Sequence, residues 1–364
     1  MNIGLLIGQT FVGGMERQAA YLSKGFIDNG HRTFVYIATP NISFKKRSKV
    51  KFPKEITFRL WGTRYTLTMT KLLLIYYCKK HNIDVLIGFQ VGAIEICNYV
   101  KASLKFPTVI GNIRGIKFMS DHKLKIRYQN ACNQLDGIIT NSNAVLQLIK
   151  DHVLTNNTIP AEMIPNIVHV PSWKYKESDD KFIVLFAASL TKVKDPLVFL
   201  KSICIATKKN QKISVLIAGN GPLKQEMEDY IKKENLASKI KFLGSVKPEK
   251  VPYNQAHLVI STSLREASSN TILEALAHGI CVIGTNVGGT TELLENKPFG
   301  RLIDPGDYHQ LAIEILQFCK LTQEEMRSNG EEAQKFIKDN FKKQQIIDKY
   351  LNFIRQVKSA KLKK

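Results

Sequence analysis

The sequence predicts an α/β protein with two domains, each built on a parallel sheet that helices cover on both faces. Short apolar runs alternate with helical stretches along most of the chain, which is typical of such sheets. The chain of 364 residues is long enough for two cores. Residues 166–180 interrupt the alternation with proline and polar residues, as a linker does. We therefore expect one domain over residues 1–170 and a second over residues 171–340.

The first domain begins with an apolar strand at residues 2–7, followed by a loop that closes with Gly13 and Gly14 and a helix from near Met15. Strand, glycine loop and helix together are typical of a Rossmann-like unit. The loop does not fit G-x-G-x-x-G, so dinucleotide binding is not expected. We expect further strands at 33–38, 56–60, 84–88, 107–111, 137–140 and 162–164, and helices at 66–81, 92–103, 121–134 and 142–152.

The second domain repeats the alternation. We expect strands at 182–188, 213–218, 240–243, 258–260, 281–284 and 300–303, and helices at 195–208, 271–278 and 307–320. A charged helical tail starts at Glu324 and breaks near Asp339. The last stretch is amphipathic, and we expect its final K-S-A-K-L-K-K to fray.

One stretch of this domain, residues 259–292, carries the strongest chemical signal. Its strand ends in small polar residues, after which Ser268, Ser269 and Asn270 offer N-cap side chains for the following helix. The free N–H groups at such a helix start, together with the positive end of the helix dipole, favour a phosphate. Glu266 precedes the helix. Glu274 lies within its apolar sequence T-I-L-E-A-L-A and needs either a structural partner or a ligand.

The two acids form Glu-x7-Glu and are followed by G-x-x-V-I-G-T-x-x-G-G-x-x-E. This pattern resembles the donor-sugar signature of retaining glycosyltransferases of the GT-B fold, glycosyltransferase family four. The resemblance covers residues 181–304 well and the first domain loosely. It implies two Rossmann-like domains that face each other across a cleft, with the final helix at 341–364 crossing back to the first domain. It also implies transfer of a sugar from a nucleotide diphosphate, with a UDP-sugar favoured.

Carried over residue by residue, the resemblance places the donor in the second domain. It assigns Glu274 to the ribose hydroxyls and Glu266 to the sugar hydroxyls, and it gives Lys194 the lysine position of G-R-L-x-x-x-K, which grips the diphosphate. Ser189 stands where that motif has arginine, and Lys192 is a possible substitute. The remaining implied donor contacts are Gly13, Gly14, Gly219, Asn220, Ser245, Val246, Ser269, Asn270 and Thr271.

We assign Lys194 and Glu266 as the catalytic residues. Negative charge grows on the leaving diphosphate, and Lys194 with the amides at Ser269 to Thr271 can stabilise it without a metal. The sequence has no Asp-x-Asp, so we expect no metal and no cofactor beyond the nucleotide-sugar substrate. In this family, retention is usually explained by front-face attack, in which Glu266 need not be a nucleophile.

Arg114 follows the fifth strand in G-N-I-R-G, at the edge where open α/β sheets bind ligands. By position it matches a residue that contacts the acceptor in related enzymes, although it can equally serve as a partner for a neighbouring side chain.

The net charge of +22 includes an excess of 13 positive charges in residues 1–172. This excess favours anionic partners, or else reflects a lysine-rich genome. No nucleic-acid-binding motif accompanies it. The stretch at 44–54 mixes six cations with Phe44, Val50 and Phe52, which suits either an anionic membrane surface or a solvated loop.

No apolar run reaches the ~20 residues of a membrane span, and the start lacks the pattern of a signal peptide. Six scattered cysteines suggest reduced thiols. We expect a cytoplasmic enzyme, either free or peripheral on the inner face of the membrane. Its expected acceptor is a glycan, favoured to be lipid-linked as in bacterial surface polysaccharide synthesis. The alternatives are a soluble acceptor, a GT-B nucleotide-sugar epimerase, and a binding protein whose site has degenerated at Ser189.

Overall fold

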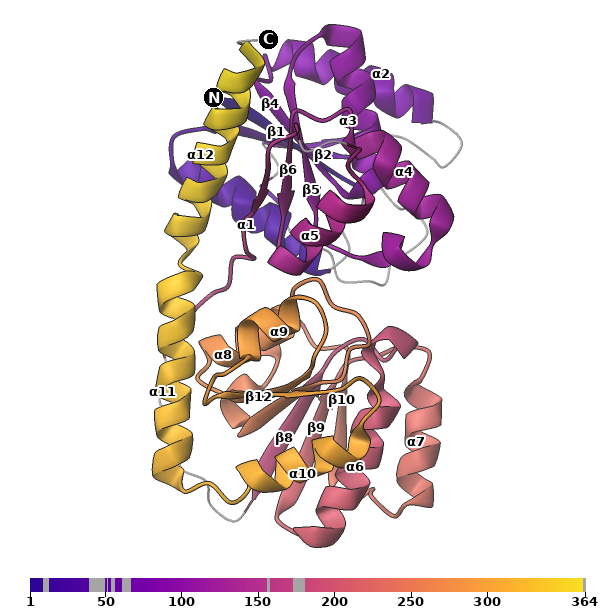
Figure 1. The fold of residues 1–364 in the computed structure, drawn as a ribbon, viewed down its shortest axis with the longest axis vertical. Helices are drawn as coiled ribbons and strands as arrows, with labels where there is room; N and C mark the ends of the chain where they lie inside the picture. Colours follow the sequence, from indigo (N-terminus) through magenta and orange to yellow (C-terminus); the bar gives the residue numbers. More distant parts are fainter. Residues whose placement is uncertain are drawn as a thin grey trace. The chain divides into compact units, whose positions relative to one another are not determined.

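The computed structural model describes residues 1–8, 13–38, 50, 52–53, 56–60, 67–155, 158–172 and 181–362. The chain forms two compact units (Figure 1). Unit 1 consists of Met1–Ile167 together with Lys343–Lys364, and unit 2 of Val168–Lys342. The chain therefore leaves unit 1 once and returns to it for its last helix. The six cations of the 44–54 stretch lie outside the described residues.

Unit 1 contains a seven-stranded sheet in the order β3-β2-β1-β4-β5-β6-β7, and every neighbouring pair is parallel. The strands are β1 (Asn2–Ile7), β2 (Arg32–Ile37), β3 (Thr57–Arg59), β4 (Val85–Phe89), β5 (Thr108–Ile113), β6 (Gly137–Thr140) and β7 (Ala161–Met163). The central strands are buried along their whole length, as continuous apolar runs in a sheet covered on both faces should be.

The helices of unit 1 are α1 (Gly14–Asp28), α2 (Leu67–Lys80), α3 (Gln90–Leu104), α4 (His122–Cys132), α5 (Asn143–His152) and α12 (Lys343–Leu362). The amphipathic prediction for α12 is confirmed, because its apolar side chains from Ile346 to Val357 are buried. Glycines let α12 approach closely: a Cβ on Gly25 of α1 would lie 2.2 Å from Ile347 Cδ1, and one on Gly137 of β6 would lie 2.8 Å from Val357 Cγ2.

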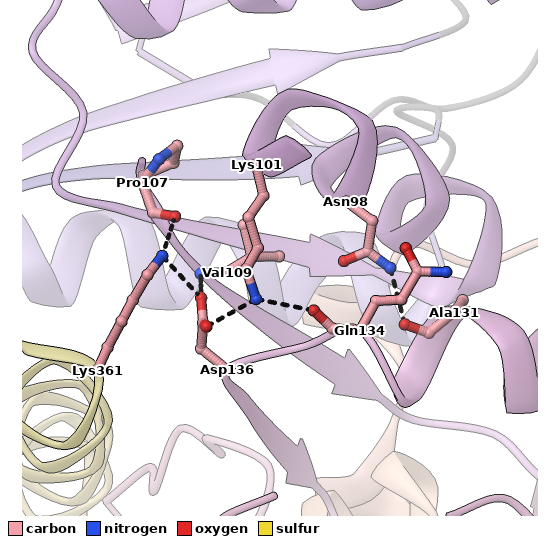
Figure 2. Close-up of polar contacts among 8 residues, drawn as sticks. All are labelled: Asn98, Lys101, Pro107, Val109, Ala131, Gln134, Asp136 and Lys361. Atoms are coloured by element: carbon pink, nitrogen blue, oxygen red, sulfur yellow. Dashed lines mark hydrogen bonds and ion pairs between the residues drawn. The ribbon is translucent and has the colours of Figure 1, made fainter. Parts of the chain in front are cut away.

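Two aspartates tie the end of α12 to unit 1. Lys358 Nζ lies 2.6 Å from Asp84 Oδ1, and Lys361 Nζ lies 3.2 Å from Asp136 Oδ2. Asp136 also accepts from Lys101 Nζ at 2.7 Å and from the Val109 amide at 2.7 Å (Figure 2). These partners explain why the helix continues to Leu362. The prediction that residues 358–364 fray was wrong as far as Leu362, because it ignored partners that are distant in the sequence, and residues 363–364 lie outside the described residues.

Unit 2 contains a six-stranded sheet in the order β10-β9-β8-β11-β12-β13, again parallel throughout. Its strands are β8 (Phe182–Ala187), β9 (Ile213–Ala218), β10 (Ile240–Gly244), β11 (Leu258–Ser261), β12 (Cys281–Thr285) and β13 (Gly300–Ile303). Its helices are α6 (Pro196–Lys209), α7 (Lys224–Lys233), α8 (Asn270–Ala277), α9 (Gly289–Leu294), α10 (Tyr308–Phe318) and α11 (Gln323–Asn340).

The predicted α/β class with two parallel sheets is confirmed. The predicted stop of α8 is also confirmed: Gly279 has φ +65° and the Ile280 amide donates back to the Ala275 carbonyl at 3.0 Å. The break between the last two helices falls between Asn340 and Lys343, close to its predicted place. Helix α9 was not predicted, because its six residues follow Gly288 and carry no clear period.

We expect Asp136→Asn to lower the free energy of unfolding by about 2–3 kcal/mol, since it weakens bonds to two ammonium groups and one amide. Urea unfolding with a constant m-value measures the change. The matched control is Glu95→Gln, which breaks an exposed pair with Arg127 at 2.6 Å and should cost no more than ~1 kcal/mol. Equal effects of the two variants would show that the Asp136 cluster has no special role.

Candidate functional site

The candidate site lies in unit 2 at the carboxyl ends of β8 and β11, which are neighbours in the sheet. A pocket opens there between the two strand ends, the loop before α6 and the start of α8. Its lining consists of Phe186, Ala187, Ala188, Lys194, Ile260, Ser261, Thr262, Ser263, Ser269 and Thr271. A polar pocket at this edge of a parallel sheet is the usual ligand position in open α/β folds.

An ion pair stands at this pocket. Lys194 Nζ lies 2.5 Å from Glu266 Oε2, and the same ammonium donates to Ser263 Oγ at 3.3 Å. Ser263 Oγ in turn donates to Glu266 Oε2 at 3.4 Å. The side chains of Lys194 and Glu266 are only 28% and 14% exposed. The structure therefore brings together the two predicted catalytic residues, which are 72 positions apart in the sequence.

The backbone around this pair is fixed by hydrogen bonds from the residues that follow β11. Thr262 Oγ1 lies 2.9 Å from the carbonyl oxygens of both Lys194 and Asp195. The Leu264 amide donates to the Val193 carbonyl at 2.8 Å. Asp195 has φ +41°, a left-handed conformation that is unfavourable for a non-glycine residue and that the Thr262 bonds help to hold. These contacts orient the short 3₁₀ turn Lys192–Lys194 towards Glu266.

Helix α8 begins at the same pocket. Ser269 is its N-cap, and its Oγ accepts from the Ile272 amide at 3.4 Å, as predicted for this position. Thr271 Oγ1 donates to the Ala187 carbonyl at 2.9 Å, which joins the helix start to the end of β8. The first amides of the helix, at Asn270 and Thr271, thus lie beside the pocket, where the helix dipole favours an anion.

Glu274 lies one turn further along α8 and is half-buried. Its Oε2 accepts from the Tyr253 hydroxyl at 2.9 Å, and its backbone carbonyl lies 2.7 Å from His278 Nδ1. The Tyr253 and His278 rings are 4.8 Å apart. Burial lowers the pKa of His278, with smaller contributions from Glu274 that raise it. The sequence indicated that Glu274 needs either a structural partner or a ligand, and the structure gives its carboxylate a hydroxyl partner on a tyrosine 21 positions away.

The predicted Gly219-Asn220 turn packs directly against the loop after β8. A Cβ on Gly219 would lie 1.8 Å from the Ala188 carbonyl oxygen, and one on Gly221 would lie 2.3 Å from the Leu190 carbonyl oxygen. The Leu190 amide donates to the Asn220 carbonyl at 3.1 Å. Both glycines are needed because only backbone fits in the space.

The same turn connects to β10 through a bond from the Gly219 amide to the Gly244 carbonyl at 2.8 Å. Ser245 and Val246 follow at this edge, the first exposed and the second half-buried. Ser189 and Lys192 are exposed as well. The edge thus collects the predicted donor residues from β8, β9 and β10 beside one another.

Gly288 packs against the backbone of Glu266. It has φ +49°, and a Cβ there would lie 2.0 Å from the Glu266 carbonyl oxygen. The G-G pair of the sequence motif therefore has a packing role: it lets the loop after β12 lie against the backbone of the Glu266 loop.

Two predicted site regions lie in unit 1. Gly13 caps α1, and a Cβ on it would lie 2.4 Å from Glu16 Oε2. Glu16 is buried, and burial raises its pKa. Gly14 is the first residue of α1, but residues 9–12 of the preceding loop lie outside the described residues.

Arg114 is bonded within unit 1. Its Nε donates to Asn112 Oδ1 at 2.9 Å, one terminal nitrogen donates to Asn166 Oδ1, and the other lies 2.5 Å from the Tyr350 hydroxyl of α12. Arg114 therefore serves as a partner for neighbouring side chains, one of the two roles that the sequence left open; the other is acceptor binding.

The site contains three residues that were not singled out from the sequence: Thr262, Ser263 and Tyr253. The first two follow a buried strand at its carboxyl end, a signal that could have identified them. Tyr253 has no such signal, because only the fold brings it to Glu274. Among the described residues no group of three or more His, Cys, Asp and Glu side chains is placed to hold a metal ion.

Fold and site together define a two-domain α/β enzyme of the GT-B class. Residues 171–336 match the family model of glycosyl transferases group 1, and residues 12–170 match that of glycosyltransferase family 4. The two models together account for most of the chain. The protein belongs to this glycosyltransferase family, and the prediction of the family is confirmed.

Two relatives and a solved structure agree with the assignment of the chain to this family and fold. A GalNAc-α-(1→4)-GalNAc-α-(1→3)-diNAcBac-PP-undecaprenol α-1,4-N-acetyl-D-galactosaminyltransferase of Campylobacter jejuni is 25% identical, with 99% of this chain and 100% of that one covered. An N-acetyl-α-D-glucosaminyl L-malate synthase of Bacillus anthracis is 26% identical, with 93% of each covered. The crystal structure of HepE of Anabaena in complex with UDP has the same fold at TM-score 0.82 and 17% identity, with 98% of this chain and 100% of that chain covered.

We expect Gly219→Ala to destabilise unit 2 by about 1–3 kcal/mol, because the new methyl group would overlap the Ala188 carbonyl and displace the loop that leads to Lys194. Thermal and urea unfolding measure the loss. Gly92→Ala in α3 is the matched control, since nothing lies within 4 Å of a Cβ there and the helix should gain or keep stability. Two unchanged unfolding curves would refute the close approach at Gly219.

Proposed function

We propose that this glycosyltransferase moves a hexosyl or N-acetylhexosaminyl group from a UDP-sugar to a glycan acceptor with retention of the anomeric configuration. The observation that carries the proposal is the half-buried Lys194–Glu266 pair, whose lysine lines a pocket together with Ser269 and Thr271 at the start of α8. A diphosphate needs cations and amide donors, and a sugar needs carboxylate acceptors. The pocket and the carboxylate paired with Lys194 beside it supply both. The complex of HepE with UDP supports uracil as the base of the donor nucleotide.

In this proposal the diphosphate lies between Lys194 and the amides at the start of α8. An ammonium has three N–H donors, of which Glu266 and Ser263 each take one. The third is directed to a phosphate oxygen. The charge that develops on the leaving diphosphate then meets a fixed cation and the positive end of a helix dipole, so no metal is required.

The two carboxylates divide the donor between them. Glu266, already held by Lys194 and Ser263, accepts from hydroxyls of the transferred sugar. Glu274 accepts from the ribose hydroxyls, with Tyr253 orienting its second oxygen. Front-face attack needs no protein nucleophile, because the departing phosphate removes the acceptor proton. The donor edge of unit 2 further comprises the proposed contacts Ser189, Gly219, Asn220, Ser245 and Val246, with Lys192 replacing the family arginine. Gly13 and Gly14 of unit 1 are further proposed donor contacts.

For the acceptor we propose a lipid-linked glycan of a bacterial surface polysaccharide, on the inner face of the cytoplasmic membrane. The undecaprenol-linked acceptor in the name of the Campylobacter jejuni relative supports this choice, as does the excess of 13 positive charges in residues 1–172. Arg114 contributes to acceptor binding through the N–H groups that its three partners leave. The L-malate synthase of Bacillus anthracis favours a soluble acceptor as the second candidate.

We expect Glu274→Gln to weaken UDP-sugar binding by roughly 10- to 100-fold, since a hydrogen bond to a charged group contributes about 1.5–3 kcal/mol. Isothermal titration calorimetry with UDP and UDP-sugars measures the affinity. Tyr253→Phe is the companion variant: it leaves the carboxylate in place and removes only its orienting hydroxyl, so it should cost less. A Glu274→Gln protein that binds UDP as tightly as the wild type would contradict the ribose assignment.

We also expect turnover to survive EDTA, because Lys194 and the start of α8 neutralise the leaving group. UDP release from a UDP-sugar is followed with and without chelator. Lys194→Met should then reduce turnover by at least about 100-fold, and added Mg²⁺ should not restore it. A strict requirement for Mg²⁺ or Mn²⁺ in the wild type would disprove this mechanism.

A further inference from the structure

Helix α2 exposes a row of large apolar side chains. Met69, Leu72 and Tyr76 are 51%, 51% and 54% exposed. Their spacing of three and four residues places them on one side of the helix. The opposite side is buried through Thr70, Leu74 and Cys78. The helix is thus apolar on two faces, of which only one is used by the core of unit 1. Figure 1 shows α2 at the periphery of this unit.

Cations border this row, which we call the α2 face (Met69, Leu72, Tyr76, Lys79 and Lys80). Lys79 and Lys80 form the last turn of α2, and both are exposed. Lys80 Nζ lies 5.6 Å from the centre of the Tyr76 ring. Within the described residues neither lysine has a carboxylate partner.

A second aromatic residue with a cation lies on the neighbouring helix. Tyr99 of α3 is 41% exposed, and Lys71 Nζ of α2 lies 4.5 Å from its ring centre. A tyrosine beside a lysine suits the boundary between lipid acyl chains and headgroups. There the tyrosine ring lies partly among the acyl chains, and the lysine ammonium contacts the lipid phosphate.

From these contacts we infer that the α2 face docks on an anionic lipid bilayer, with Met69, Leu72 and Tyr76 inserted between headgroups and Lys79 and Lys80 on lipid phosphates. The inference rests on the proposed function in one respect only: such docking would bring unit 1 to a lipid-linked acceptor. No helix among the described residues is long and apolar enough to cross the bilayer, so the contact is with its surface.

The size and charge of the face argue for lipid over a protein partner. Three half-exposed side chains offer about 300 Å² of apolar surface, well below the ~800 Å² per partner of a stable protein interface. A bilayer needs no such area, because a few inserted side chains act together with the attraction of nearby lysines to anionic headgroups.

The test is sedimentation of the full chain with phosphatidylglycerol vesicles and, separately, phosphatidylcholine vesicles. We expect binding to the anionic vesicles at about 0.1 M salt and release at about 1 M, where the Debye length falls to ~3 Å. Lys79→Gln with Lys80→Gln should weaken binding about 30-fold. Met69→Ser with Leu72→Ser should weaken it at least about tenfold and leave UDP affinity and thermal unfolding unchanged.

Matched controls come from unit 2. Lys232→Gln with Lys233→Gln removes the same pair of exposed lysines from the last turn of α7. Ile313→Ser removes an apolar side chain of α10 that is 47% exposed. Both should bind vesicles like the wild type. The inference is overturned if the wild type stays in solution, if it binds both lipids equally, or if the control variants lose binding as much as the α2 variants.

The result of the vesicle experiment does not depend on the donor chemistry proposed for unit 2. UDP affinity, measured on the same preparations, tests the proposed function through unit 2. Protein that binds UDP but no vesicles overturns the docking surface and leaves the transferase proposal intact. Protein that binds vesicles through the α2 face but no UDP supports the surface and contradicts the proposed donor.

Discussion

The structure of the site depends on one charged contact, the pair between Lys194 and Glu266. Both side chains are largely withdrawn from water, and either charge alone would be costly there. Together they compensate each other, so the site holds a cation and an anion 2.5 Å apart. In the proposed mechanism the diphosphate takes the N–H group of Lys194 that Glu266 and Ser263 leave, and sugar hydroxyls donate to the carboxylate. Ligand binding in this mechanism adds contacts to two charges that already hold each other in place.

The pair can form only because several loops approach one another backbone to backbone. Gly219 and Gly221 lie against the loop that leads to Lys194, and Gly288 lies against the carbonyl of Glu266. At each place a Cβ would come within 2.3 Å of a carbonyl oxygen. The glycines of this half of the chain therefore set the distance between the loops. They thereby fix the position of the two charged side chains of Lys194 and Glu266.

The sequence was sufficient for what depends on local pattern. The Ser269 cap, the end of α8 at Gly279 and the order of strands and helices follow from caps, glycines and apolar runs, and the structure confirms them. The family resemblance assigned Lys194 and Glu266 to one donor site, but their ion pair was not predicted, because no local rule connects residues so far apart. Tyr253 and the lysines that hold the end of α12 were missed for the same reason: their partners meet only through the order of strands in the sheet.

Arg114 shows how a structural and a chemical role can share one side chain. A guanidinium has five N–H donors in a fixed plane. Asn112, Asn166 and Tyr350 of α12 take three of them. The plane is thereby locked, and two donors at most are left for an acceptor. Asn112 also donates to the Tyr350 hydroxyl at 2.9 Å, so the arginine, the end of β5 and the final helix form one network. An acceptor bound at Arg114 would be held by a group whose orientation is set by β5, by the segment after β7 and by α12. Arg114 is therefore better suited to orienting an acceptor hydroxyl or phosphate than to capturing it by charge alone.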